Sequence, residues 1–104
     1  MGNRTHPTGP APDRGVYAIS VAAELCGAPI HLLRVWERHG LLTPARSQGG
    51  TRRYSVDDIT LLHRITALAA AGVNVVGISR ILELEDDYAV ARGAKTRKPR
   101  PDGP

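Results

Sequence analysis

Two short helical segments, a glycine-rich turn and a cluster of arginines follow one another in the first half of the chain. The first segment is expected over residues 20–27 and the second over 29–39, and a hairpin centred on Gly49 and Gly50 follows. A short helix, a tight turn and a second helix with basic residues have a shape that fits a DNA groove. The arginine-bearing hairpin after them makes a winged helix-turn-helix the predicted fold.

Length and composition allow one small domain. The 104 residues, 41% of them hydrophobic, support only a small core. We expect a mainly α domain over residues 16–87, with about four helices and a short two-stranded wing. Residues 1–15 are predicted to form a disordered arm and residues 88–104 a basic, disordered tail. The tail could touch phosphates or simply be solvated, and the sequence leaves both open.

The charge balance suits a polyanionic partner without identifying it. The net charge of +4 and the pI near 9.8 would fit DNA, RNA, an acidic membrane or none of these. No signal peptide or long apolar run is evident, so we expect a cytoplasmic protein with no membrane partner. The single cysteine, Cys26, is interpreted as a buried structural thiol, with redox or metal sensing as the alternative.

Capping residues indicate where the first two helices begin and end. Ser20 is expected to cap the first helix, because its hydroxyl can accept a free backbone N–H. Gly27 supplies the permissive backbone that ends this helix. Pro29 is expected in the first turn of the second helix, where its missing N–H would have had no intrahelical partner.

Two further helices are predicted after the hairpin. The spacing of Ser55 and Asp58 resembles a capping box, and the third helix should run from there to about Ala71. Asn74 is expected to cap the fourth helix, and its core-facing residues recur at helical spacing: Val75, Ile78, Ile81 and Leu82.

The second helical segment divides into two faces. Leu33 and Trp36 can point toward the core. A neighbouring face, which we expect to lie against DNA, carries residues at steps of three and four: His31, Arg34, Val35 and Arg38. Residues 41–44 are expected to form a short strand, 45–50 a loop and 51–54 the return strand. This arrangement brings Arg46, Arg52 and Arg53 together on one projection.

Three stretches resemble the DNA-binding domain of MerR-type transcription regulators. They are Ile19-Ser20-Val21-Ala22-Ala23-Glu24-Leu25, Leu33-Arg34-Val35-Trp36-Glu37-Arg38-His39-Gly40-Leu41-Leu42-Thr43-Pro44, and Gly50-Thr51-Arg52-Arg53-Tyr54-Ser55 with Asp58-Ile59. The heat-shock repressor branch is similar also at Val73-Asn74-Val75-Val76-Gly77-Ile78 and Ile81-Leu82-Glu83-Leu84-Glu85. The resemblance covers roughly residues 16–85, and the Leu-Arg-x-Trp-Glu-Arg run and the Gly-x-Arg-Arg-Tyr-Ser wing are its most specific parts.

The resemblance implies a recognition helix around Arg34 and a wing arginine, Arg52, that reaches the DNA backbone. Together with the residue chemistry it gives a predicted DNA-binding set: Ser20, His31, Arg34, Val35, Trp36, Arg38, Arg46, Arg52, Arg53 and Tyr54. Three alternatives stay open. Arg34 could instead pair with Glu37 or Glu24, Trp36 could be buried against Leu33, and Tyr54 could pack beneath the wing.

No nucleophile elbow, phosphate loop or paired carboxylates are present, so we expect no catalysis, no cofactor and no metal site. The resemblance implies a sequence-specific transcription regulator, a repressor of stress or chaperone genes. Two alternatives are a small architectural or excisionase-like protein that assembles head-to-tail on DNA, and a protein-interaction module. The resemblance also implies an Hsp70-class chaperone as co-repressor, and RNA polymerase is a further candidate partner.

The family's dimerisation device is not expected here. MerR-type regulators pair through a long helix after the fourth one, but no sustained apolar heptads follow Leu84. A homodimer through another surface and a head-to-tail oligomer on DNA therefore both stay open.

Overall fold

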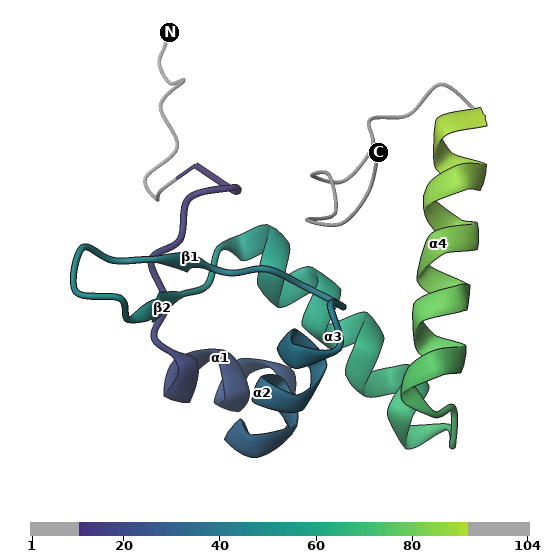
Figure 1. Ribbon diagram of the computed structural model, residues 1–104, viewed down its shortest axis with the longest axis horizontal. Coiled ribbons are helices and arrows are strands. Elements are labelled where there is room, and N and C mark those ends of the chain that lie inside the picture. The colour runs from purple at the N-terminus through teal and green to yellow at the C-terminus, as the bar shows by residue number, and fades with distance from the viewer. Residues whose placement is uncertain (1–10, 92–104) are drawn as a thin grey trace, which may run out of the picture.

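The computed structural model describes residues 11–91, with side chains described through residue 86, and this part contains four helices and one two-stranded hairpin (Figure 1). In chain order the elements are α1 (Ile19–Cys26), α2 (Ile30–Arg38), β1 (Ala45–Arg46), β2 (Arg52–Arg53), α3 (Val56–Ala70) and α4 (Val75–Ala91). The hairpin, called the wing below, projects at one edge of the molecule, and α4 stands at the opposite edge beside the end of α3 (Figure 1). The expected mainly α fold with a short wing is confirmed.

Helices α1 and α2 form the predicted helix-turn-helix, bent by 101°. Gly27 ends α1 as expected, with a φ of +76° that side chains other than glycine rarely allow. The prediction that Ser20 caps α1 is wrong, because the helix begins one residue earlier and Ala18 occupies the cap position. Pro29 likewise precedes α2 as its extended N-cap instead of lying in the first turn.

The wing begins later than predicted. Residues 41–44 form no strand, and the strand lies instead at Ala45–Arg46, which we expected to be loop. Leu41 and Leu42 are both buried, and consecutive side chains cannot share one face of a strand, so this stretch fills the core instead. The two strands pair antiparallel, with Arg46 opposite Arg52, and Gly50 takes the positive φ at the tip.

The segment before α1 belongs to the domain from residue 11 onward. Tyr17 and Tyr54 form an antiparallel bridge, in which the Tyr54 N–H donates to the Tyr17 carbonyl at 2.7 Å. Gly15 lies so close to the wing that a Cβ there would come within 2.6 Å of the Arg53 carbonyl oxygen. The carbonyl of Pro12 accepts the Asp57 N–H at 3.0 Å. Residues 11–15, expected to lie in the arm, therefore brace the wing, and residues 1–10 lie outside the described part.

Helix α3 begins with the predicted capping box. The Ser55 hydroxyl accepts the Asp58 N–H at 3.0 Å, and the Asp58 carboxylate accepts the Ser55 N–H at 2.9 Å. Asn74 caps α4 as expected, because its side-chain oxygen accepts the Gly77 N–H at 2.9 Å. Helix α4 continues through Ala91, past the predicted boundary at residue 87, and the rest of the predicted tail lies outside the described residues.

The core lies between the four helices, with Tyr54 entering from the wing. Its largest fully buried apolar side chains are Leu33, Tyr54, Leu62, Ile65 and Ile78. Cys26 is buried with its thiol 3.6 Å from the Ala23 carbonyl oxygen, in agreement with a structural role. Within the described chain, no single helix is long and apolar enough to cross a membrane, and α1 and α2 pass that test only as a bent pair.

The capping box gives a prediction about stability. Ser55→Ala should lower the free energy of unfolding by about 1–2 kcal/mol, because a first-turn N–H would lose its partner. Ser20→Ala is the matched control, since Ser20 makes no cap, and should change it by less than about 0.5 kcal/mol. Urea denaturation followed by circular dichroism measures both, and equal losses would contradict these cap assignments.

Candidate nucleic-acid interface

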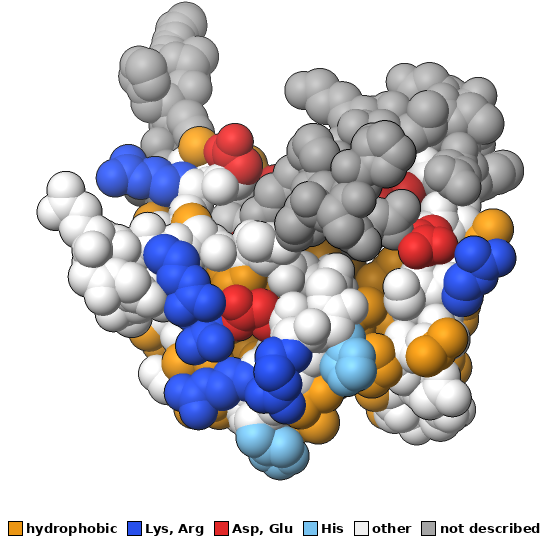
Figure 2. Space-filling model, in the orientation of Figure 1, with side chains coloured by type: hydrophobic (Ala, Val, Ile, Leu, Met, Phe, Trp, Pro, Cys, Tyr) orange, Lys and Arg blue, Asp and Glu red, His pale blue; other side chains and the backbone are white. Residues whose placement is uncertain are grey.

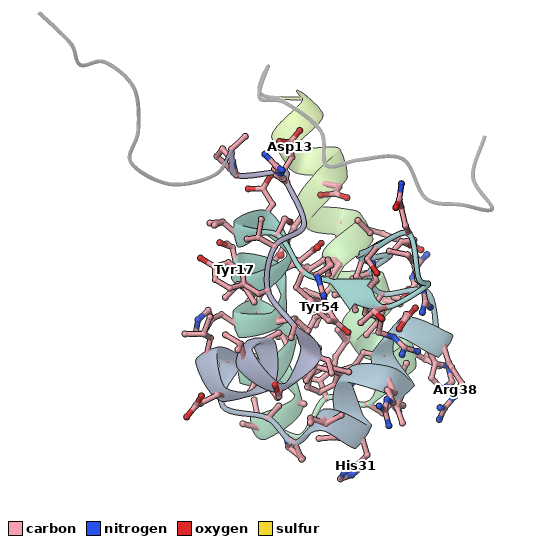
Figure 3. The ribbon with its side chains drawn as sticks, turned by 90° about the vertical axis from the view of Figure 1, so that its left-hand side faces the viewer. Asp13, Tyr17, His31, Arg38 and Tyr54 are labelled. Atoms are coloured by element: carbon pink, nitrogen blue, oxygen red, sulfur yellow. The ribbon has the colours of Figure 1, made fainter. Side chains whose placement is uncertain are left out.

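Helix α2 presents a basic face to solvent. His31, Arg34 and Arg38 are exposed, while Leu33 and Trp36 on the other side are buried in the core. Figure 3 shows the labelled His31 and Arg38 side chains projecting away from the body of the protein. Three of the four side chains predicted to face a duplex are therefore exposed, and the fourth, Val35, is half-buried.

A single carboxylate joins α2 to both strands of the wing. Glu37, in the last turn of α2, accepts a hydrogen bond from Arg46 Nη2 at 2.9 Å and another from Arg52 Nε. Arg46 lies on β1 and Arg52 directly opposite on β2. The Glu37 side chain is only 17% exposed, so water screens these contacts less than at an open surface. We call this set, Glu37 with Arg46 and Arg52, the Glu37 clamp.

The two arginines of the clamp differ in which of their nitrogen atoms bind within the protein. Arg52 is bound through Nε, which leaves its two terminal amino groups outside that contact. The hydrogen bond to Glu37 raises the pKa of Arg52 and outweighs the opposing effect of burial, so the guanidinium remains charged. Arg46 uses both terminal nitrogens inside the protein, since Nη1 also donates to the Gly50 carbonyl at 3.1 Å. Arg46 thus braces the tip of the wing.

The predicted site residues Arg34 and Arg52 are both neighbours of Glu37. Arg34 precedes Glu37 by three positions, which places the two side chains as neighbours on the helix surface. Glu37 in turn bonds to Arg52, so Glu37 links the basic face of α2 to the wing. Figure 2 shows arginine side chains gathered over α2 and the wing around an acidic spot. Arg53 joins the wing as a partly exposed side chain opposite Ala45.

The alternative for Arg34, an ion pair with Glu37 or Glu24, is wrong. Among the side chains that the structure describes, none forms an ion pair with Arg34, and Glu37 binds the wing instead. Sequence reasoning missed Glu37 as a functional residue. The available signal was an acid on an otherwise basic helix, followed by a hairpin with an arginine on each strand.

Two residues of the predicted DNA-binding set are buried and cannot reach a duplex. Trp36 is 3% exposed, so the alternative of burial beside Leu33 is correct. Tyr54 is 0% exposed and belongs to the core cluster, as expected for a residue packed beneath the wing. Val35 is half-buried against the core, whereas Ser20 is exposed in the first turn of α1. The side chains of the set that remain accessible come from α1, α2 and the wing.

The buried Tyr54 hydroxyl has no hydrogen-bond partner among the described residues. Burial raises the pKa of this phenol above its ordinary value, and the nearby Glu37 carboxylate adds to the rise.

Within the described chain, no three His, Cys, Asp or Glu side chains gather where they could hold a metal ion.

Residues 17–85, more than half of the chain, match the family of MerR HTH regulatory proteins. The chain is 45% identical over 89 residues to the heat shock protein HspR of Streptomyces coelicolor, covering 85% of this chain and 59% of that protein. It is 39% identical over 67 residues to the HTH-type transcriptional repressor CarH of Myxococcus xanthus, covering 64% of this chain and 22% of that protein. The chain thus spans less than two thirds of the length of these curated relatives.

A solved structure shares the fold. It is the crystal structure of HiNmlR, described as a MerR family regulator that lacks the sensor domain and is bound to promoter DNA. The TM-score is 0.59 and the sequence identity 26%, over 73% of this chain and 63% of that chain.

The unpartnered Tyr54 hydroxyl leads to a second stability prediction. Tyr54→Phe should leave the protein as stable as the wild type at neutral pH, or more stable by up to about 1 kcal/mol, because a buried hydroxyl without a partner costs free energy. The unfolded chain releases the phenol proton at lower pH than the folded chain does, so stability is lost as pH rises past the ordinary tyrosine pKa. The phenylalanine variant should lack that part of the alkaline loss.

Urea denaturation at neutral and at alkaline pH tests this pair of expectations. A variant that is clearly less stable than the wild type at neutral pH would show that the hydroxyl is bonded in solution.

Proposed function

Because the chain belongs to the MerR HTH family of regulatory proteins, we propose that it binds double-stranded DNA sequence-specifically and regulates transcription. The observation that carries this proposal is the Glu37 clamp, which sets the wing beside the exposed basic face of α2. A rigid helix and an adjacent charged hairpin are the two parts that a winged helix-turn-helix needs to hold a duplex. The regulator HiNmlR, described as bound to promoter DNA without a sensor domain, supports the same reading.

In this proposal α2 enters the major groove. Arg34 presents a planar fork that can grip the O6 and N7 atoms of guanine, and His31, near the start of the helix, faces neighbouring base edges. Arg38, one turn beyond Arg34, contacts the flanking backbone. Val35 holds the helix on the core and offers only its outer edge to the groove.

The wing and α1 hold the phosphates. The terminal amino groups of Arg52 lie outside the clamp contact and can bind a phosphate while Nε stays on Glu37. Arg53 extends this contact along the backbone, and Arg46 contributes charge while bracing the wing tip. Ser20, exposed in the first turn of α1, is placed to meet a phosphate on the other side of the groove.

The sign of regulation is proposed from the relatives. Of the two named curated relatives, one is described as a heat shock protein and the other as a transcriptional repressor. We therefore assign this chain to repression of stress or chaperone genes, by occupation of promoter DNA in the cytoplasm. The same names do not favour the architectural or excisionase-like alternative, and we propose no enzymatic activity.

Partners beyond DNA are proposed from the resemblance to heat-shock repressors. They are a second copy of the chain, paired symmetrically or arranged head-to-tail on DNA, and an Hsp70-class chaperone or RNA polymerase. Light scattering with and without a selected duplex distinguishes one copy per site from two.

Two substitutions test the placement of the duplex. Arg34→Ala should weaken binding to a duplex selected from a random library by about 1–3 kcal/mol, with a smaller effect on random DNA, because it removes a base contact. Arg52→Ala should weaken binding to both duplexes and lower the slope of log affinity against log salt by roughly one, because it removes a phosphate contact. Fluorescence anisotropy titrations at several salt concentrations measure both effects.

Arg80→Ala is the matched control, since Arg80 is an exposed arginine on α4 that pairs with Glu83. It should leave both affinities close to the wild type. Wild-type binding by both the Arg34 and Arg52 variants would refute the proposed interface.

A further inference from the structure

The Glu37 clamp places a negative charge where the proposed interface needs positive charge. Both wing arginines that donate to Glu37 would otherwise have these nitrogens, Arg46 Nη2 and Arg52 Nε, available to phosphates. Their partner carboxylate is itself mostly buried beside them, so its charge remains close to any phosphate that the wing contacts. A residue that only had to hold the wing in place would not need to be an acid.

We propose that Glu37 is a specificity-determining residue, which makes binding to random DNA weaker while it prepares the wing for the correct site. This inference rests on the proposed function, since it needs a preferred sequence to exist. Glu37 itself contacts no base. It acts through the arginines that it holds.

The first part of the proposed effect is that Glu37 orients the wing relative to α2. Each wing strand has only two residues, and a hairpin of that length has little stability of its own. Glu37 ties both strands to the last turn of α2, so the wing keeps one position relative to the helix that reads bases. When α2 lies in the major groove of the preferred sequence, the terminal groups of Arg52 are already directed at a phosphate. Binding then costs no further conformational entropy for ordering the wing.

The second part of the proposed effect is repulsion between the Glu37 carboxylate and the DNA phosphates. Binding to random DNA depends on phosphates alone and gains nothing from a preset angle between helix and wing. On random DNA the negative charge of Glu37 therefore acts without any benefit from the preset angle, and it reduces the attraction of the arginine pair for the backbone. The carboxylate therefore disfavours contacts made by the wing alone, and the ratio of specific to random affinity rises.

Two variants separate the two parts. Glu37→Gln removes the charge and leaves one acceptor oxygen, so it should strengthen binding to a random duplex by about threefold to tenfold at low salt. Binding to the selected duplex should stay the same or weaken, so the specificity ratio falls. Glu37→Asp keeps the charge but is shorter by one methylene and cannot reach both strands; it should weaken the selected duplex and leave the random duplex unchanged.

Glu24→Gln is the matched control, because Glu24 is an exposed acid on α1 with no ion pair among the described residues. It makes the same change in net charge and should change neither affinity by more than about twofold. A double variant, Glu37→Gln with Arg52→Gln, should lose most of the gain on random DNA, since the proposed effect passes through Arg52.

The measurements are anisotropy titrations of each variant against the selected and the random duplex, with thermal unfolding as a check of folding. A specificity ratio that stays at the wild-type value in both Glu37 variants overturns the inference, and so does an equal gain in Glu24→Gln. Should Glu37→Gln fail to fold, Glu37→Asp decides alone, and equal weakening on both duplexes overturns the inference. If the wild type enriches no sequence from a random library, the proposed function itself fails instead.

Discussion

One carboxylate between two guanidinium groups determines how the parts of this protein are arranged. The wing is too short to hold itself in place, because its ladder contains only two residue pairs. Glu37 ties its strands to the end of α2, and the bridge between Tyr17 and Tyr54 ties its base to the start of the domain. The wing therefore takes its position beside the basic face of α2 from contacts made outside its own strands.

The core beneath the clamp explains why α2 can serve as its support. Leu33 and Trp36 bury the inner side of α2, while Tyr54 fills the space directly under the wing. A fully packed inner side leaves the helix one orientation, so its outer residues face solvent as a fixed set. Trp36 and Tyr54, which were predicted to bind DNA, are thus core residues, and the arginines of α2 and the wing are the residues of that set that stay accessible.

Local features of the sequence predicted the local structure well. The capping box at Ser55 and Asp58, the αL end of α1 at Gly27 and the Asn74 cap each depend on residues a few positions apart, and all three are confirmed. The cap at Ser20 failed because α1 begins at Ile19, so that Ala18 takes the cap position and Ser20 lies inside the first turn. Leu41 and Leu42 were predicted to lie in a strand because they are apolar and precede the hairpin. Both are buried in the core, which no pattern within this short stretch indicates.

The sequence indicated which basic residues would be exposed in the candidate site, but it did not predict the Glu37 clamp that joins α2 to the wing. Exposed basic residues on α2 could be found by helical periodicity, because one element determines which of its faces is outside. The Glu37 clamp joins positions on α2, β1 and β2, and its geometry depends on the first strand, which the sequence placed at residues 41–44 instead of Ala45–Arg46. Burial of Trp36 and Tyr54 likewise follows from packing between elements and not from their own spacing.

The most direct test of the clamp is the backbone mobility of the wing, measured by 15N relaxation on the free protein and on Glu37→Gln. Order parameters for residues 46–52 should lie near those of the helices in the wild type and fall below about 0.6 in the variant, with α1 and α3 unchanged. A wing that is equally rigid in both proteins would show that Glu37 does not hold it.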